Sequence, residues 1–175
     1  MRATLRRPRR RDELPSSHFL PALRFRRLGI LPLSPAPEMA GYSGTPLPKK
    51  LGIKEGHLVA LLNAPDRFER TLGALPENVR LQQGLAGKTP LDVIVCFVMR
   101  RAELEGQLAT IRRRMAPAAG LWVAWPKKAS GVATDMTEHV VREVALPTGL
   151  VDNKVCALDE TWSGLRLVIR LENRG

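Results

Sequence analysis

The chain of 175 residues is 44% hydrophobic and 26% charged, an ordinary composition for a globular protein with one core. No uninterrupted apolar run approaches 18 residues, so the sequence predicts no membrane-spanning segment. Cys96 and Cys156 lie inside apolar runs without the paired short spacings of zinc or redox motifs, and we expect buried free thiols and no metal site. Reduced thiols and the lack of a secretory signal indicate a cytoplasmic protein.

The net charge of +11 is unevenly distributed along the chain. Residues 1–38 contain nine arginines against three acids, a net charge of +6, together with six prolines and no hydrophobic period. This composition is typical of a disordered basic tail. Residues 39–175 carry 19 basic and 14 acidic residues and are predicted to form a single domain. We therefore expect no nucleic-acid partner except through the tail, and no membrane partner.

Three interpretations of the tail are open. It could serve as an arm for nucleic acid or a membrane surface, act as a targeting peptide, or represent an upstream stretch read from a start codon placed too early. Met39 is followed by Ala40 and then by well-patterned sequence, which favours the third interpretation.

Short elements are predicted in the first half of the domain. Thr45-Pro46 supplies a helix start, and we predict helices over 46–51 and 65–72, each ended by a glycine. Apolar or β-branched runs predict strands over 57–62, 79–82 and 91–98. The last of these is nearly continuous in apolar residues, as is typical of a strand covered on both faces.

Longer elements follow in the second half. A helical stripe with a charged face runs over 102–115, and a strand is predicted over 120–125. A further helix is expected from about Asp135, which has capping-box spacing to Glu138. Two final strands joined by a short polar turn predict an antiparallel hairpin, over 152–158 and 165–171.

The alternation of strands and helices predicts an α/β fold. We expect a three-layer, Rossmann-like, mostly parallel sheet with helices on both faces and a C-terminal antiparallel hairpin. This order resembles a trimmed methyltransferase-type fold, in which one strand–helix unit is missing between Gln83 and Leu91.

Polar and basic residues follow the predicted strands where ligands bind in such folds, at the carboxyl edge of the sheet. We predict a site there for an anion such as a phosphate-bearing ligand, because cations and helix N-termini both favour negative charge. The alternative is that these charged residues merely solvate loop ends. The candidate ligand-binding residues are Lys127, Lys128, Ser130 and Gly131, assisted by Arg100 or Arg101, with Asn63 after the first strand.

The same edge lacks two features of cofactor-binding Rossmann folds. The turn after the first strand, Asn63-Ala64-Pro65, contains no glycine, and the second strand ends in Gln82-Gln83 without an acid for ribose hydroxyls. We therefore predict no cofactor. The histidines, at positions 18, 57 and 139, have no evident catalytic arrangement, and no catalytic residue is identified.

The best functional hypothesis is a non-catalytic binding or regulatory module. One alternative is an enzyme of unidentified chemistry on a methyltransferase-like fold. Another is a protein-interaction module that uses Trp162 in the hairpin turn as a partner contact, although packing of Trp162 on the sheet edge is also open.

Three longer motifs carry a family resemblance. They are Gly-Tyr-Ser-Gly-Thr-Pro-Leu at 41–47, Trp-Pro-Lys-Lys-Ala-Ser-Gly at 125–131, and Gly-Leu-Val-Asp-Asn-Lys-Val-Cys at 149–156. The chain resembles the bacterial family labelled domain of unknown function 3052 over residues 40–172. The resemblance implies a small bacterial cytoplasmic α/β protein without an assigned activity, and it supports Met39 as the natural start.

Overall fold

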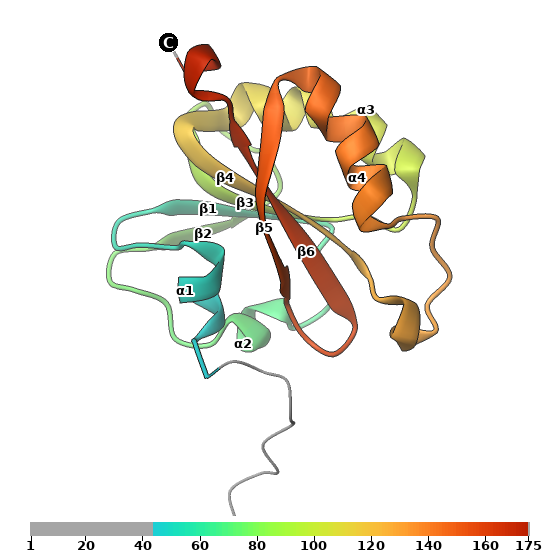
Figure 1. Ribbon diagram of the computed structural model, residues 1–175. Coiled ribbons are helices and arrows are strands. Elements are labelled where there is room, and N and C mark those ends of the chain that lie inside the picture. The colour runs from blue at the N-terminus through green and yellow to red at the C-terminus, as the bar shows by residue number, and fades with distance from the viewer. Residues whose placement is uncertain (1–43, 175) are drawn as a thin grey trace, which may run out of the picture. The chain divides into compact units, whose positions relative to one another are not determined.

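The computed structural model describes residues 44–174, so the predictions for the tail at residues 1–38 lie outside the described residues. The described chain alternates strands and helices and ends in a hairpin (Figure 1). Its elements, with η denoting a 3₁₀ helix, are α1 (Leu47–Leu51), β1 (Leu58–Leu62), α2 (Phe68–Leu72), β2 (Arg80–Gln83), β3 (Leu91–Phe97), α3 (Arg101–Arg114), β4 (Met115–Pro126), η1 (Lys128–Ser130), α4 (Glu138–Ala145), η2 (Leu146–Thr148), β5 (Leu150–Ala157), β6 (Trp162–Ile169) and η3 (Leu171–Asn173).

The strands form one sheet of six, in the order β2-β1-β3-β4-β6-β5. The first four strands of the chain are parallel to one another, whereas β6 is antiparallel to both of its neighbours, β4 and β5. The crossover through α4 leads from β4 to β5, and β6 then returns through the hairpin and fills the place between them. The predicted α/β fold with a mostly parallel sheet and a terminal hairpin is therefore confirmed.

Helices cover both faces of the sheet (Figure 1). Buried residues of α3 and α4, such as Leu108 and Val141, belong to one apolar cluster, and Leu51 of α1 and Phe68 of α2 belong to another. Alternate residues of the central strands supply the two clusters, because successive strand side chains point to opposite faces. Trp122 lies in the second cluster and Trp125 in the first, because an odd spacing along a strand places two side chains on opposite faces.

The structure corrects the predicted start of α2. The helix was expected from Pro65, but it begins at Phe68 because Arg67 adopts a left-handed conformation with φ of 65°. The residues in front of it form a turn, so that α2 is a single short turn of helix packed by its buried Phe68 and Leu72.

The predicted capping box of α4 is also wrong. The helix begins at Glu138, and the N-cap is Thr137, whose hydroxyl accepts a hydrogen bond from the Val140 amide at 3.2 Å. The Asp135 carboxylate instead accepts a bond from the Arg101 amide at 2.8 Å, at the start of α3. A side chain expected to start one helix therefore caps another.

The connection from β2 to β3 contains no helix, which agrees with the missing unit predicted between Gln83 and Leu91. The guanidinium of Arg114, at the end of α3, holds this connection by donating hydrogen bonds to the backbone carbonyls of Ala86, Gly87 and Thr89. The Gln82 amide also donates to the carbonyls of Gly84 and Ala86, so two side chains fasten the segment to the domain.

Three strands differ from their predicted bounds by more than one residue. The strand expected over 120–125 spans Met115–Pro126, and the hairpin strands span Leu150–Ala157 and Trp162–Ile169.

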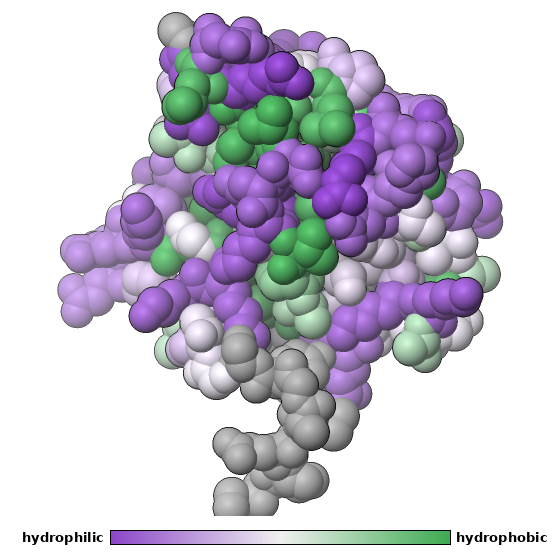
Figure 2. All heavy atoms as spheres, in the orientation of Figure 1, coloured by the Kyte–Doolittle hydropathy of each residue, from purple (hydrophilic) through white to green (hydrophobic). Residues whose placement is uncertain are grey.

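No helix within residues 44–174 is long and apolar enough to cross a membrane. Hydrophilic side chains dominate the face seen in Figure 2, with hydrophobic patches between them, one of them near the end of the sheet that carries η3.

Candidate functional site

A crevice is expected where the strand order of the sheet reverses. The chain passes from β1 to β2 on one side and then returns to place β3 on the other side of β1. In open α/β sheets the connections after two such strands leave in different directions, and ligands bind between them at the carboxyl ends. Here that point lies between the ends of β1 and β3.

A cavity of about 570 Å³ is found at this point, within the usual size range for small-molecule sites. We call it the switch-point pocket, and its walls are largely apolar with a few polar groups. Residues from the turn after β1, the end of β3, the first two turns of α3 and the start of β6 line it: Asn63, Pro65, Phe97, Met99, Glu103, Gln107 and Trp162.

The Asn63 side chain, directly after β1, makes a hydrogen bond to the end of β3 at the base of this pocket. Asn63 has a left-handed backbone with φ of 52°, a conformation that asparagine tolerates better than most residues. Its Nδ2 donates a hydrogen bond of 3.4 Å to the Phe97 carbonyl at the end of β3. The side chain therefore fixes the ends of β1 and β3 relative to each other at the mouth of the pocket.

Aromatic rings form one wall. Phe97 lies edge to face with Phe68 on one side, at a centroid distance of 4.7 Å, and with Trp162 on the other, at 5.0 Å. Such pairs add stability beyond the area they bury. Trp162 is half-buried, so part of the indole remains available to a ligand. This position agrees with packing on the sheet edge, one of the alternatives for this residue.

Carboxylates already occupy the start of α3. Glu103 Oε2 accepts hydrogen bonds from the amides of Met99, at 3.0 Å, and Arg100, at 3.3 Å. Asp135 accepts from the next amide, that of Arg101. A free helix N-terminus attracts anions because its amides lack partners. Here three consecutive amides are satisfied by negative side chains, so this end of the helix offers little to an external anion.

Cys96 belongs to the buried core beside the pocket. Its Sγ lies 3.9 Å from Gln107 Oε1, and burial, aided by the charge of Glu103, raises the pKa of the thiol to about 12. The group is therefore a neutral thiol at physiological pH, which is unsuited to nucleophilic attack.

The predicted residues after β4 lie close together in one turn. Lys127 Nζ donates to the Asp159 carbonyl at 2.6 Å and so fastens the turn to the β5–β6 hairpin. The Ser130 hydroxyl donates to the Lys127 carbonyl at 2.7 Å and accepts from the Val132 amide at 3.3 Å. Gly131, with φ of 70°, follows η1, and Lys128 is exposed. Many of these polar groups thus hold the turn itself.

The two predicted arginines differ in their surroundings. The Arg101 guanidinium pairs with Glu105 at 2.7 Å and with Glu143 of α4 at 2.9 Å, and these partners raise its pKa, the hydrogen bond to Glu105 most. Arg101 therefore links α3 to α4 rather than extending toward Lys127. Arg100 is exposed at the start of α3.

Sequence reasoning named only Asn63 and Trp162 among the residues that line the switch-point pocket. Glu103 and Gln107 are four residues apart, so they share one face of α3 directly after the strongest predicted strand. This spacing would have allowed Glu103 and Gln107 to be predicted as residues of a site. Phe97 and Met99 had no such signal, because apolar residues at a strand end equally indicate a core.

Comparison with known proteins gives a likeness of fold. No protein-family model and no curated protein matches the chain. A SAM-dependent methyltransferase from Aquifex aeolicus is 15% identical, with 69% of this chain and 87% of that chain covered and a TM-score of 0.51. The structure of a DhpI–SAH complex is 11% identical, with coverages of 70% and 81% and a TM-score of 0.50.

A third structure is that of the PH0226 protein from Pyrococcus horikoshii OT3, 10% identical, with coverages of 71% and 86% and a TM-score of 0.50. At these identities the likeness shows the fold alone. The chain therefore has a methyltransferase-like Rossmann fold, as the order of its strands and its inserted antiparallel strand indicate.

Proposed function

We propose that this chain is a non-catalytic module that binds a small molecule in the switch-point pocket. The observation that supports this most directly is a cavity of about 570 Å³ at the reversal point of the sheet, with aromatic and polar groups converging on it. The lining contains no histidine, and the neighbouring Cys96 is a neutral thiol. Because this thiol is not a nucleophile at physiological pH, we favour recognition over catalysis at this site.

The chemistry of the lining favours a flat ring that carries an amino group, as in an adenine nucleoside. Glu103 is the charged side chain of the lining, and its Oε1 makes no hydrogen bond with the described residues. This oxygen can accept from a ligand amine. The carboxamides of Asn63 and Gln107 can pair with ring heteroatoms, and Trp162 offers a surface for stacking.

The similar structures include a SAM-dependent methyltransferase and a DhpI–SAH complex. The residues of this chain do not fit the usual cradle for such a cofactor. Asn63 carries a side chain in the turn after β1, and Pro65 lacks an amide hydrogen there. At the end of β2, the Gln82 amide bonds to two nearby carbonyls and that of Gln83 to Glu69. We therefore favour binding over methyl transfer.

The phosphate-bearing ligand predicted from Lys127, Lys128, Ser130 and Gly131 is a second candidate, as is a partner contact through Trp162. The exposed ammonium of Lys128 beside the left-handed Gly131 supports the first of these. The negative charge of Glu103 and the capped start of α3 oppose a phosphate inside the switch-point pocket itself. The two ligand classes can be separated by one titration series.

The proposal is tested by isothermal titration of the full chain with adenosine, AMP, inorganic phosphate and S-adenosylmethionine. We expect saturable binding of adenosine, no tighter binding of AMP, and no binding of phosphate. Glu103→Gln should weaken adenosine binding about tenfold, because it removes a charged acceptor while retaining an oxygen for the cap. Trp162→Ala should have a similar effect, and Lys128→Ala should have none.

Three outcomes would contradict the proposal. The first is AMP or phosphate binding that depends on Lys128 and not on Glu103, which would support the anion site. The second is turnover of a bound ligand, which would support the enzyme alternative. The third is a failure of adenosine and S-adenosylmethionine to bind, combined with loss of a co-purifying protein on Trp162→Ala, which would support the interaction module.

A further inference from the structure

A second site is indicated by an arginine that has no partner among residues 44–174. Arg112, in the last turn of α3, is half-buried, and its Nε is fully buried without a hydrogen-bond partner in that range. Its guanidinium forms no hydrogen bond or ion pair with any residue in the described range 44–174. Leaving a buried charged donor unsatisfied costs more than an ordinary lost hydrogen bond.

Other arginines of the same layer have partners. Arg142 of α4 pairs with Glu138 at 2.5 Å and with Asp152 at 2.9 Å, and Arg101 pairs with two glutamates. Arg114 also has a buried Nε without a partner, but its terminal nitrogens bond to three carbonyls. Of these four arginines, only Arg112 has a guanidinium without a hydrogen bond or ion pair to the described residues.

The Arg112 guanidinium lies against the junction of η2 and β5. A Cβ at Gly149 would stand 3.2 Å from Arg112 Nη2 and 3.0 Å from Asn173 Nδ2. Gly149 has φ of 84° and no side chain, so this close approach is possible. Two nitrogen donors thus approach the same backbone position, and neither is bonded to an acceptor in the described part of the chain.

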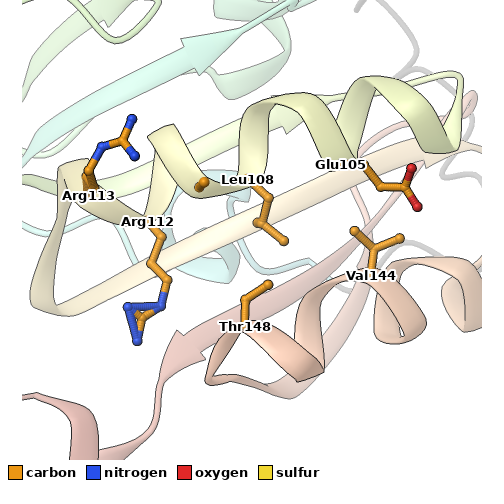
Figure 3. A pocket seen from close by; sticks show the side chains of 7 residues that line it. Glu105, Leu108, Arg112, Arg113, Val144 and Thr148 are labelled. Carbon is orange, nitrogen blue, oxygen red and sulfur yellow. The ribbon is translucent and has the colours of Figure 1, made fainter.

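A cavity of about 400 Å³ opens beside this guanidinium, between α3 and α4. We call it the interhelical pocket, and it is lined by Glu105, Leu108, Ala109, Arg112, Arg113, Val144 and Thr148. Figure 3 shows Leu108 and Arg112 extending from α3 toward α4 and η2, whereas Arg113 extends away from them. Arg113 Nη2 donates to the Thr110 hydroxyl at 3.1 Å on that outer side.

The charged and apolar residues that line this pocket indicate the class of ligand that fits it. The middle is apolar, formed by Leu108, Ala109 and Val144, and Arg112 supplies a planar fork of donors at one end. At the other end lies the carboxylate of Glu105, which already pairs with Arg101 at 2.7 Å, so that end offers no unpaired cation of the lining to a second anionic group. We propose that the interhelical pocket binds an aliphatic monocarboxylate, with its carboxylate on Arg112 and its chain along Leu108 and Val144.

Octanoate is the probe for this site, titrated into the full chain by calorimetry. We expect saturable binding that weakens about tenfold or more in Arg112→Met, which keeps the apolar stem but removes the donors. The control is Arg70→Met, an exposed arginine of α2 that lines neither cavity, which should bind octanoate as the unmodified chain does. Acetate, 1-octanol and inorganic phosphate should each bind at least tenfold more weakly than octanoate.

A second variant keeps the test decisive if Arg112→Met fails to fold. Val144→Trp leaves Arg112 in place and fills the apolar part of the pocket, so it should also abolish octanoate binding. Octanoate affinity that is equal in the unmodified chain, Arg112→Met and Val144→Trp would overturn the proposal, as would a lack of saturable binding. Phosphate binding stronger than octanoate binding would overturn the ligand class.

This site is independent of the switch-point pocket. None of the residues that line one cavity lines the other. Glu103→Gln should therefore leave octanoate binding unchanged, and Arg112→Met should leave adenosine binding unchanged. Loss of both ligands in either single variant would contradict two separate sites.

Discussion

At the scale of single residues, burial determines which side chains can react. Cys96 is fully buried and Cys156 half-buried, and burial raises the pKa of both thiols. Nearby Lys154 and Lys50 act in the opposite direction at Cys156. Because the thiolate is the reactive form, the two cysteines should differ strongly in chemical behaviour although their sequence surroundings are alike.

We predict that Ellman's reagent at pH 8 modifies only Cys156 in the folded chain and a second thiol after denaturation. The folded pKa of Cys96, about 12, is above its unfolded value near 9.0. Its contribution to stability is therefore present below about pH 9 and is lost as pH rises toward 12. The free energy of unfolding of Cys96→Ala should therefore fall less over this alkaline range than that of the unmodified chain. Cys156→Ser should keep the fall that Cys96 causes. Reaction of both thiols at pH 8 without denaturant would contradict the prediction.

At the scale of elements, α3 and α4 differ in where the side chains that cap them come from. Asp135 caps α3 from 34 residues away, and Glu103 caps it from within. Thr137 caps α4 locally. The loop is therefore fixed to the start of α3 just before α4 begins, since the Thr134 hydroxyl also donates to the Met99 carbonyl at 2.6 Å.

We predict that Thr137→Ala and Asp135→Ala each destabilise the chain by about 1 kcal/mol, the usual effect of losing a helix cap. The two variants should differ in the part of the chain that loses protection. Hydrogen exchange should rise in the first turn of α4 for Thr137→Ala and at the start of α3, around Arg101, for Asp135→Ala. Equal hydrogen-exchange protection at the start of α3 in Asp135→Ala and in the unmodified chain would show that Asp135 does not stabilise this end of the helix.

The assignment of Asp135 illustrates what the sequence could predict. Local signals identified the strands, α1 with its glycine stop, and the long helix between β3 and β4, because each depends on neighbouring residues. The partner of Asp135 could not be found locally, since its carboxylate bonds across 34 residues. The same limit hid Phe97 and Met99 as pocket residues, because their position depends on the approach of distant strand ends.

At the scale of the whole molecule, the strand order matches a methyltransferase-type sheet with one strand–helix unit fewer. The connection from β2 to β3 must therefore cross from the edge of the sheet to the far side of β1 without a helix of its own. Such a segment has few apolar contacts, and only Leu85 packs against the core from it. Its backbone carbonyls are bound by Arg114 and, at Gly84 and Ala86, by the amide of Gln82.

We predict that Arg114→Ala loosens residues 84–90 and lowers the free energy of unfolding by about 1–2 kcal/mol, as expected for losing hydrogen bonds to a charged donor. Arg113→Ala, the neighbouring exposed arginine, is the matched control and should change stability by less than about 0.5 kcal/mol. Hydrogen exchange and limited proteolysis should localise the effect to this connection. If Arg114→Ala leaves both unchanged, the connection is held by its own turns, and the loss of a strand–helix unit needs no compensating side chain.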